Sequence, residues 1–125
     1  GAHAVIVPRE HSAPLSAVAR RAASGAVESI PVFQVVNLAR TLRALKEAGI
    51  WLAGASQDAD TDIFRADLRR PLALVLGGEG KGLRRLTQEE CDMRVRIPMA
   101  GSVESLNVSV AVGICLFEAV RQRQG

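Results

Sequence analysis

The chain has 125 residues, enough for one hydrophobic core, because domains of this size bury roughly two-thirds of the surface that the unfolded chain exposes. We therefore expect a single domain over residues 1–125, and the 3% of aromatic residues excludes an RNA-binding platform made of several stacked rings. The net charge of +3 arises in the arginine-rich second half, which suits either a polyanionic partner or an ordinary solvated surface.

The first part of the chain predicts two strands with a helix between them. Ala4–Val7 is a short apolar run that Pro8 closes, as is typical of a buried strand. Pro14 opens a helix whose apolar residues recur at helical spacing as far as Gly25. Residues 30–36 then predict a second strand.

A second helix and two further strands follow. Three leucines recur on one helical stripe, and Gly49 ends the pattern. These leucines are Leu38, Leu42 and Leu45. The small and apolar residues 50–55 predict a third strand, and the five apolar residues 72–76 favour a fourth strand that is covered on both faces.

The connection between these two strands, residues 56–70, is polar and acidic. It predicts a loop or a short turn of helix. We expect its few apolar side chains to anchor it to the core, namely Ile63, Phe64 and Leu68.

The last third of the chain completes the alternation of elements. Thr87 and Glu90 have the spacing of a capping box for a short helix, and residues 94–99 alternate charged and apolar side chains as a fifth strand would. Residues 106–123 predict a long helix that is apolar on nearly every side, so it is either central to the fold or covered by a second copy of the chain. The order of elements predicts an α/β fold with a mostly parallel sheet and helices on both faces.

Several classes of protein are excluded by composition. No apolar run approaches the roughly 18 to 20 residues of a membrane helix, and no signal peptide is present, so we expect a soluble, cytoplasmic protein. Cys91 and Cys115 are too few for a disulfide framework or a metal site, and we expect both to be small apolar core residues. The chain opens with Gly-Ala-His in place of Met, which suggests that a further segment lies upstream.

Residues 74–83 run from a strand into four glycines, at the sheet edge where open α/β folds bind ligands. The spacing is not that of a P-loop, because Gly82 follows Lys81, and Leu83 stands where a dinucleotide-binding fingerprint requires its last glycine. Glu79 would also repel phosphate, so a neutral or cationic ligand packed against bare backbone fits better. A tight turn with several positive φ angles explains the glycines without any ligand.

A polar cluster precedes the last helix. The strand end and turn at residues 97–101 lead into it, and Ser105 is a candidate N-cap. Capping does not explain Asn107 or Ser109, which place polar groups at the edge of an otherwise apolar helix. We expect the Asn107 amide to face whatever occupies the mouth of that helix.

Residues 74–83 and 97–110 resemble motifs two and three of the SpoU/TrmH class of SPOUT RNA 2'-O-ribose methyltransferases. The continuation through residues 113–121, together with residues 1–8 and 24–26, is similar to the branch that methylates guanosine ribose in bacterial 23S rRNA. The likeness covers essentially the whole chain, and its third motif is highly specific.

The resemblance implies a trefoil knot at the carboxyl-terminal end of the sheet, S-adenosylmethionine bound within it, and a homodimer formed through the C-terminal helix. It implies cofactor contacts, largely through backbone groups, at Gly77, Ile97 and Leu106. Further residues would line the same pocket, namely Gly78, Gly82, Pro98 and Met99. The polar active-site positions of the family match Glu79, Ser105 and Asn107, and a cationic sulfonium would tolerate Glu79 where a phosphate would not. No metal is implied.

Two other hypotheses stay open at this point. The family's first motif, which contains an arginine thought to help deprotonate the ribose hydroxyl, precedes the position at which this sequence begins. The chain could therefore be a catalytically incomplete knotted module that binds the cofactor or RNA. An unrelated nucleotide-binding α/β domain is the third hypothesis, and the failed phosphate motifs argue against it.

Overall fold

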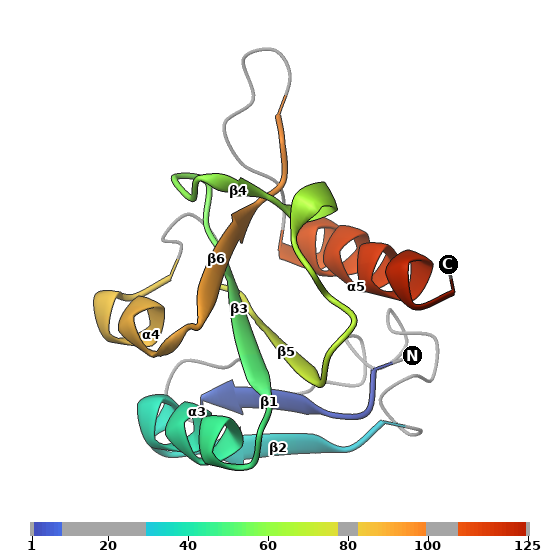
Figure 1. The fold of residues 1–125 in the computed structure, drawn as a ribbon. Coiled ribbons are helices and arrows are strands. Elements are labelled where there is room, and N and C mark those ends of the chain that lie inside the picture. Colours follow the sequence, from blue (N-terminus) through green and yellow to red (C-terminus); the bar gives the residue numbers. More distant parts are fainter. Residues whose placement is uncertain (1, 9–29, 78–82, 100–107, 125) are drawn as a thin grey trace. The chain divides into compact units, whose positions relative to one another are not determined.

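The strands of the computed structural model, which describes residues 2–8, 30–77, 83–99 and 108–124, form two parallel sheets (Figure 1). Residues 1–41 and 42–125 are two compact units. In the first unit, β1 (Val5–Pro8) pairs with β2 (Val32–Val35), and Val5 lies opposite Val32. The predicted single domain stays a prediction.

The second unit contains a four-stranded sheet in the order β4-β6-β3-β5. These strands are β3 (Trp51–Ala55), β4 (Thr61–Asp62), β5 (Leu72–Val75) and β6 (Met93–Arg96). All their pairings are parallel, so the predicted fold class is confirmed. The apolar strand β3 is central, as a strand buried on both faces must be.

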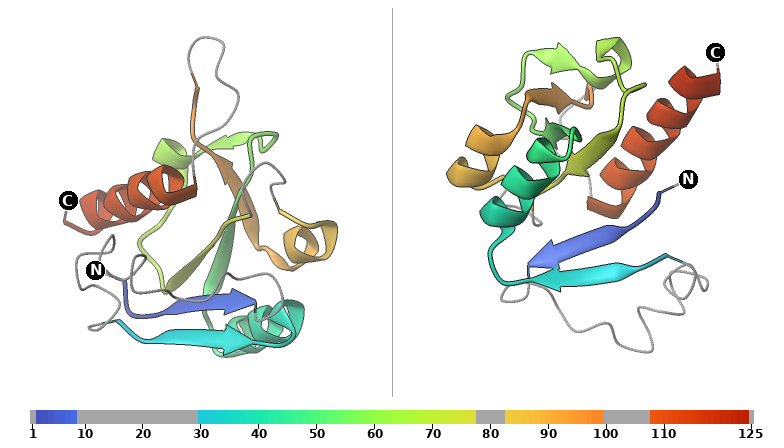
Figure 2. Two further views of the ribbon diagram at one scale, coloured as in Figure 1. Left: turned by 180° about the vertical axis from the view of Figure 1, so that it is seen from behind. Right: turned by 60° about the horizontal axis from the view of Figure 1, so that its bottom comes forward.

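Helices lie on both sides of this sheet. Figures 1 and 2 show α4 (Arg85–Glu90) on one side and α5 (Val108–Gln124) on the other. Because successive side chains of a strand point to opposite faces, Leu72 and Leu74 of β5 pack toward α5, whereas Ala73 alternates to the other side. The 17-residue α5 confirms the long helix predicted for residues 106–123.

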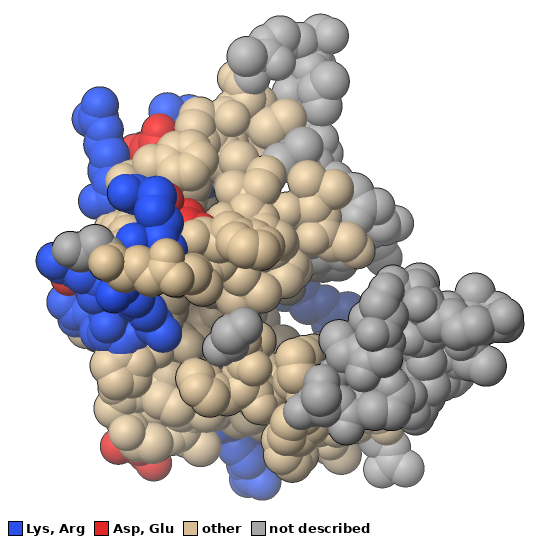
Figure 3. Space-filling view, turned by 90° about the vertical axis from the view of Figure 1, so that its right-hand side faces the viewer, with Lys and Arg blue, Asp and Glu red and all other residues tan. Residues whose placement is uncertain are grey.

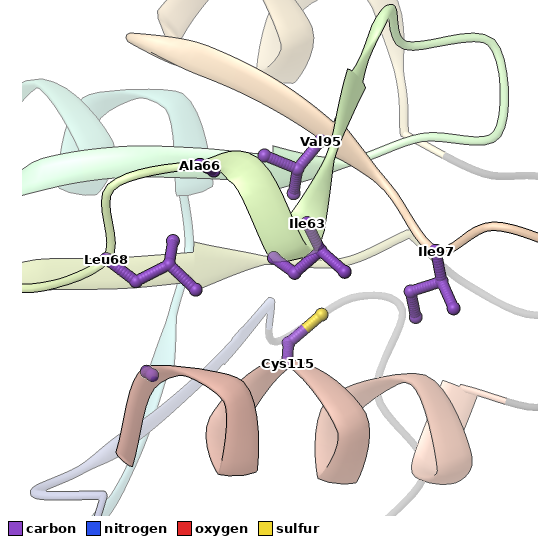
Figure 4. Close-up of a cluster of buried hydrophobic side chains, with 7 residues drawn as sticks. Ile63, Ala66, Leu68, Val95, Ile97 and Cys115 are labelled. Carbon is purple, nitrogen blue, oxygen red and sulfur yellow. The ribbon is translucent and has the colours of Figure 1, made fainter. Parts of the chain in front are cut away.

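The main core lies between the sheet and α5. Figure 4 shows side chains from β6 and from the segment after β4 converging on Cys115, which projects from α5. The buried members are Ile63, Ala66, Leu68, Val95, Ile97, Cys115 and Ala119. Cys115 is fully buried and reduced, which confirms its prediction as an apolar core residue.

Helix α3 (Leu38–Glu47) ends as its sequence predicts. Gly49 adopts φ of +88°, a conformation that residues with a Cβ rarely adopt. Its N–H donates to the carbonyl of Lys46, and the N–H of Ile50 donates to the carbonyl of Leu45. This pair of hydrogen bonds satisfies carbonyls that the last turn of the helix leaves without partners.

Two local predictions are wrong. Thr87 does not cap α4, because the helix begins at Arg85 and Thr87 is buried inside it, where its carbonyl accepts from the Cys91 thiol. Phe64 does not anchor the 56–70 segment, because it is 50% exposed. It belongs to the 3-10 helix η1 (Ile63–Arg65), and a single turn there buries Ile63 and turns the next side chain outward.

Several predicted elements differ in extent. Strands β2, β3, β5 and β6 are each shorter than the predicted runs, and Pro98 and Met99 lie beyond the end of β6. Strand β1 has the predicted length but begins and ends one residue later. The helix predicted from Pro14 to Gly25 lies outside the described residues. Among the described helices, none combines the length and the apolar character that a membrane-spanning segment requires.

Candidate functional site

The ends of β5 and β6 lie at the same edge of the four-stranded sheet, on either side of β3. Gly54 of β3 is level with Val75 of β5 and with Arg94 of β6. Neighbouring strands are roughly 4.8 Å apart, so the two ends are about 10 Å apart across β3. The two segments that carry the predicted cofactor contacts therefore leave the sheet from one edge, where open α/β folds bind ligands.

Four of the predicted site residues are described at this edge. Gly77 and Met99 are half-buried and Pro98 is exposed. Ile97 is buried in the core on the α5 side (Figure 4). A site at this position would thus present backbone groups and apolar side chains.

The remaining predicted residues lie outside the described part of the chain, and their placement stays a prediction. They are Gly78, Glu79, Gly82, Ser105, Leu106 and Asn107. The structure describes the residues on either side of them. Gly77 precedes residues 78–82 and the buried Leu83 follows them, while Met99 and the start of α5 flank residues 100–107.

Gly54 of the central strand β3 packs against Leu83, the first described residue after the glycine-rich segment. A Cβ at this position would lie 2.7 Å from Cys91 Sγ and 2.9 Å from Leu83 Cδ1, both closer than real Cβ contacts. The absent side chain therefore allows Leu83 and Cys91 to pack directly on β3. We did not single out Gly54 from the sequence, although a glycine within an apolar strand is a signal of such a close approach.

Ser56 and Asp58 are further polar residues that sequence reasoning missed. They follow β3, between the ends of β5 and β6, and the Ser56 hydroxyl donates to the Asp58 carboxylate. This hydrogen bond, with the Asp58 backbone N–H and the charge of Arg94, holds the pKa of Asp58 below its usual value. Their position directly after a central parallel strand could have identified them from the sequence as candidate site residues.

Neither cysteine has the character of a nucleophile. Burial is the main cause that raises the pKa of Cys91 to about 11, and burial also raises the pKa of Cys115. Both thiols are therefore protonated at neutral pH, whereas a nucleophilic cysteine requires a thiolate. In the described part of the chain, no group of three His, Cys, Asp or Glu side chains is placed to hold a metal ion.

Comparisons with known proteins agree with this arrangement. Residues 1–117 match the model of the SpoU rRNA Methylase family. The chain is 60% identical over its whole length to a 23S rRNA (guanosine-2'-O-)-methyltransferase RlmB of Pectobacterium atrosepticum, of which it covers 51%. It is 58% identical over 123 residues to the protein of the same name from Escherichia coli K12, again covering 51% of that protein. The chain thus spans about half the length of the curated relatives it matches.

Solved structures of this class have the same fold. The crystal structure of an RNA 2'-O ribose methyltransferase superposes with a TM-score of 0.89 and 34% identity over all of this chain and 48% of the other. AviRb from Streptomyces viridochromogenes, a SpoU methyltransferase solved in complex with AdoMet, has a TM-score of 0.88 and 36% identity over 98% of this chain and 51% of the other. This chain belongs to the SpoU rRNA methylase family.

Proposed function

We propose that this chain carries the methyl-transfer domain of an enzyme that methylates the ribose 2'-hydroxyl of a guanosine in 23S rRNA, with S-adenosylmethionine as the methyl donor. The relatives with 58–60% identity have this activity in their names. The observation that carries the proposal is the common edge at which β5 and β6 end, on either side of β3. An enzyme acting on ribosomal RNA would work in the cytoplasm, as the sequence predicts.

The described residues of this edge fit the proposed cofactor. S-adenosylmethionine has an adenine ring and a methionine chain, which suit apolar side chains and backbone hydrogen bonds such as Gly77, Ile97, Pro98 and Met99 can offer. We propose that Leu106, Gly78 and Gly82 complete the pocket. The trefoil knot would involve segments outside the described residues, and it stays part of this proposal.

The chemistry divides between the cofactor and the chain. The bound cofactor supplies a methyl group on a positively charged sulfur. We propose that Glu79, Ser105 and Asn107 hold the ribose so that its 2'-oxygen lies in line with that methyl group, because fixing two reactants in position supplies a large part of a rate enhancement. Neither cysteine has a role in this proposal, since both thiols are protonated at neutral pH.

Replacing Asn107 tests the assigned activity. We expect Asn107→Ala to lower methyl transfer to 23S rRNA by about ten-fold or more, because it removes an oriented polar group, while S-adenosylmethionine binding changes by less than about two-fold. Transfer of labelled methyl groups measures the first quantity and calorimetry the second. Gln34→Ala, which removes an exposed amide from β2, is the matched control and should keep full transfer. Undiminished transfer by Asn107→Ala would contradict its assignment.

We also propose that the chain forms a homodimer through α5. Val110 is 50% exposed and Phe117 is 76% exposed, and seven residues, or about two turns, place them on one face of the helix. Gly113 lies between them on that face, and the space beside it is empty. A large exposed phenyl ring in an apolar stripe is typical of an interface.

Light scattering after size-exclusion chromatography tests the dimer. We expect Phe117→Gln to shift the protein from twice the chain mass toward a monomer, because the amide loses most of the apolar area that the interface would bury. Phe64→Gln replaces another exposed phenylalanine, which lies on η1 and away from this stripe, and it should leave the mass unchanged. A monomeric parent chain, or equal dimerisation by both variants, would contradict the interface.

A further inference from the structure

An arginine-lined groove lies on the α5 side of the second unit, between η1 with the segment that follows it and the end of α5. Its volume is about 370 Å³. It is lined by Phe64, Arg65, Ala66, Asp67, Arg69, Arg121 and Gln122. Figure 3 faces the side of the chain where α5 ends, and it shows Lys and Arg side chains gathered along one margin of this face.

The charge of this region is positive even after its ion pairs are counted. Three arginines line the groove and two more adjoin it, and these five positive charges exceed the two negative charges of the Asp67 and Glu118 carboxylates. Asp67 faces both Arg69 and Arg70, and Glu118 is paired with Arg121. The five arginines are Arg65, Arg69, Arg70, Arg121 and Arg123. Arg65 is exposed and forms no ion pair among the described residues.

The walls of the groove are fixed by hydrogen bonds between segments far apart in the sequence. The Gln122 amide accepts from the Leu68 N–H at 2.8 Å and donates to the Ala66 carbonyl at 2.8 Å. Arg123 donates to the carbonyls of Leu68 and Arg70. The arginines therefore stand on a pre-organised surface, so an anion would not have to order this part of the chain on binding.

A second hollow lies beside the groove and shares Arg65 with it. This hollow is formed by Asp60, Thr61, Asp62, Arg65 and Arg96. Arg96 is the last residue of β6 and directly precedes Ile97. Asp62 is engaged in capping η1, where its carboxylate accepts from the Phe64 N–H. A chain bound in the groove could thus extend, past Arg65 and Arg96, to the edge where β6 ends.

Phe64 adds an apolar contact to this charged surface. Its ring is half exposed and lies in the same groove as three guanidinium groups. One ring is no platform for several bases, but a single base can stack on it while the arginines contact the flanking phosphates. Double-stranded RNA would keep its bases stacked on one another, so this combination favours an unpaired strand.

We infer that this groove binds a segment of single-stranded RNA, with Arg65, Arg69 and Arg121 contacting phosphates and Phe64 contacting a base, and that it leads the substrate strand to the end of β6. The inference rests on the proposed function and adds to it the surface that the RNA occupies. None of the residues that line the groove is a predicted cofactor contact, so RNA binding there and cofactor binding can be measured separately.

The experiment titrates the unchanged chain and its variants with a fluorescent single-stranded oligoribonucleotide of mixed sequence, at several KCl concentrations. Each phosphate contact on a single strand contributes about 0.7 to the slope of log affinity against log salt. We expect Arg65→Gln and Arg69→Gln each to lower that slope by about 0.7, which is about five-fold in affinity at roughly 0.1 M salt. Phe64→Ala should weaken binding without changing the slope, since it removes no charge.

Arg43→Gln is the matched control for Arg69→Gln. Arg43 is 57% exposed and pairs with Glu90, much as Arg69 is 68% exposed and pairs with Asp67, but Arg43 lies on α3. We expect it to keep the parent slope. If the groove variants keep the parent slope as well, the charge serves another partner, such as an acidic protein surface, and the inference is overturned. Equal dependence on these arginines for an RNA duplex would overturn the single-strand assignment.

Two further readouts separate this inference from the proposed function. S-adenosylmethionine binding by the groove variants, measured by calorimetry, should equal that of the parent chain. If the parent chain neither binds the cofactor nor transfers methyl groups while the salt slopes change as expected, the proposed function fails and the RNA groove stands. If the chain methylates 23S rRNA and the slopes do not change, the groove fails and the function stands.

Discussion

At the scale of single residues, Gly54 shows how one missing side chain can determine the surroundings of a site. Because it has no Cβ, Leu83 and Cys91 both reach the central strand β3. Leu83 is the first described residue after the glycine-rich segment 77–82, and it packs against β3 at Gly54. The packing of Gly54 therefore contributes to the stability of the fold next to the segment that carries the predicted cofactor contacts.

Gly54→Ala should destabilise the chain by about 1–3 kcal/mol, because the added methyl group overpacks a filled core. The displaced Leu83 should also weaken S-adenosylmethionine binding. Urea unfolding measures the first effect and calorimetry the second. Adding Cys91→Ala to the variant removes the closest contact, the one at 2.7 Å, and should restore part of the stability. A Gly54→Ala protein as stable as the parent would contradict the close packing of Leu83 and Cys91 against β3.

At the scale of elements, the end of α5 is connected to the segment after η1 through a polar cluster. Glu118 is buried and accepts hydrogen bonds from Arg121 at 2.7 and 2.8 Å and from Gln122 at 2.9 Å. Gln122 in turn holds the backbone of Ala66 and Leu68. The Arg121 guanidinium, with a smaller effect of Gln122, lowers the pKa of Glu118 from 4.5 to about 2.

This pKa predicts how stability depends on pH. A carboxyl whose pKa is lower in the folded state than in the unfolded state stabilises the fold above the unfolded value, near 4.5, and loses that contribution as the pH falls toward about 2. We expect Glu118→Gln to cost about 1–2 kcal/mol at pH 7, a figure that allows for the solvent exposure of Arg121. The difference from the parent should shrink between pH 4.5 and pH 3 in urea unfolding. A difference independent of pH would contradict the ion pair.

Much of the element order could be predicted from local patterns. The apolar runs of β3 and β5 and the length of α5 need no long-range information, and Gly49 marks the end of α3 because only its φ suits that position. The candidate site was predicted in a different way. Its residues came from a resemblance to a family, and the structure describes four of them, all at one sheet edge.

What local patterns could not predict depends on burial and on distant contacts. The Thr87 spacing resembles a cap, but its burial inside α4 depends on packing that no local pattern contains. The two-residue β4 exists because it pairs with β6, more than thirty residues later in the chain. The hydrogen bonds of Gln122 cross more than fifty residues, so the sequence gives no sign of the groove that they fix.

At the scale of the whole molecule, the parallel pairing of β5 and β6 with β3 is the feature of the fold that supports the proposed function. A parallel sheet sends the carboxyl ends of β5 and β6 to the same edge, with β3 between them. Antiparallel pairing of either strand with β3 would have sent the two predicted contact segments to opposite edges. Family membership and the common edge therefore support the same proposed site.

Hydrogen exchange with and without saturating S-adenosylmethionine tests this central claim most directly, because it reports on both segments in one measurement. We expect the cofactor to slow amide exchange in residues 76–83 and in residues 97–108 together, and to leave α4 at residues 85–90 unchanged, since α4 is not part of the proposed pocket. Protection of one segment alone, of neither, or of residues away from this edge would contradict a cofactor site built from both strand ends.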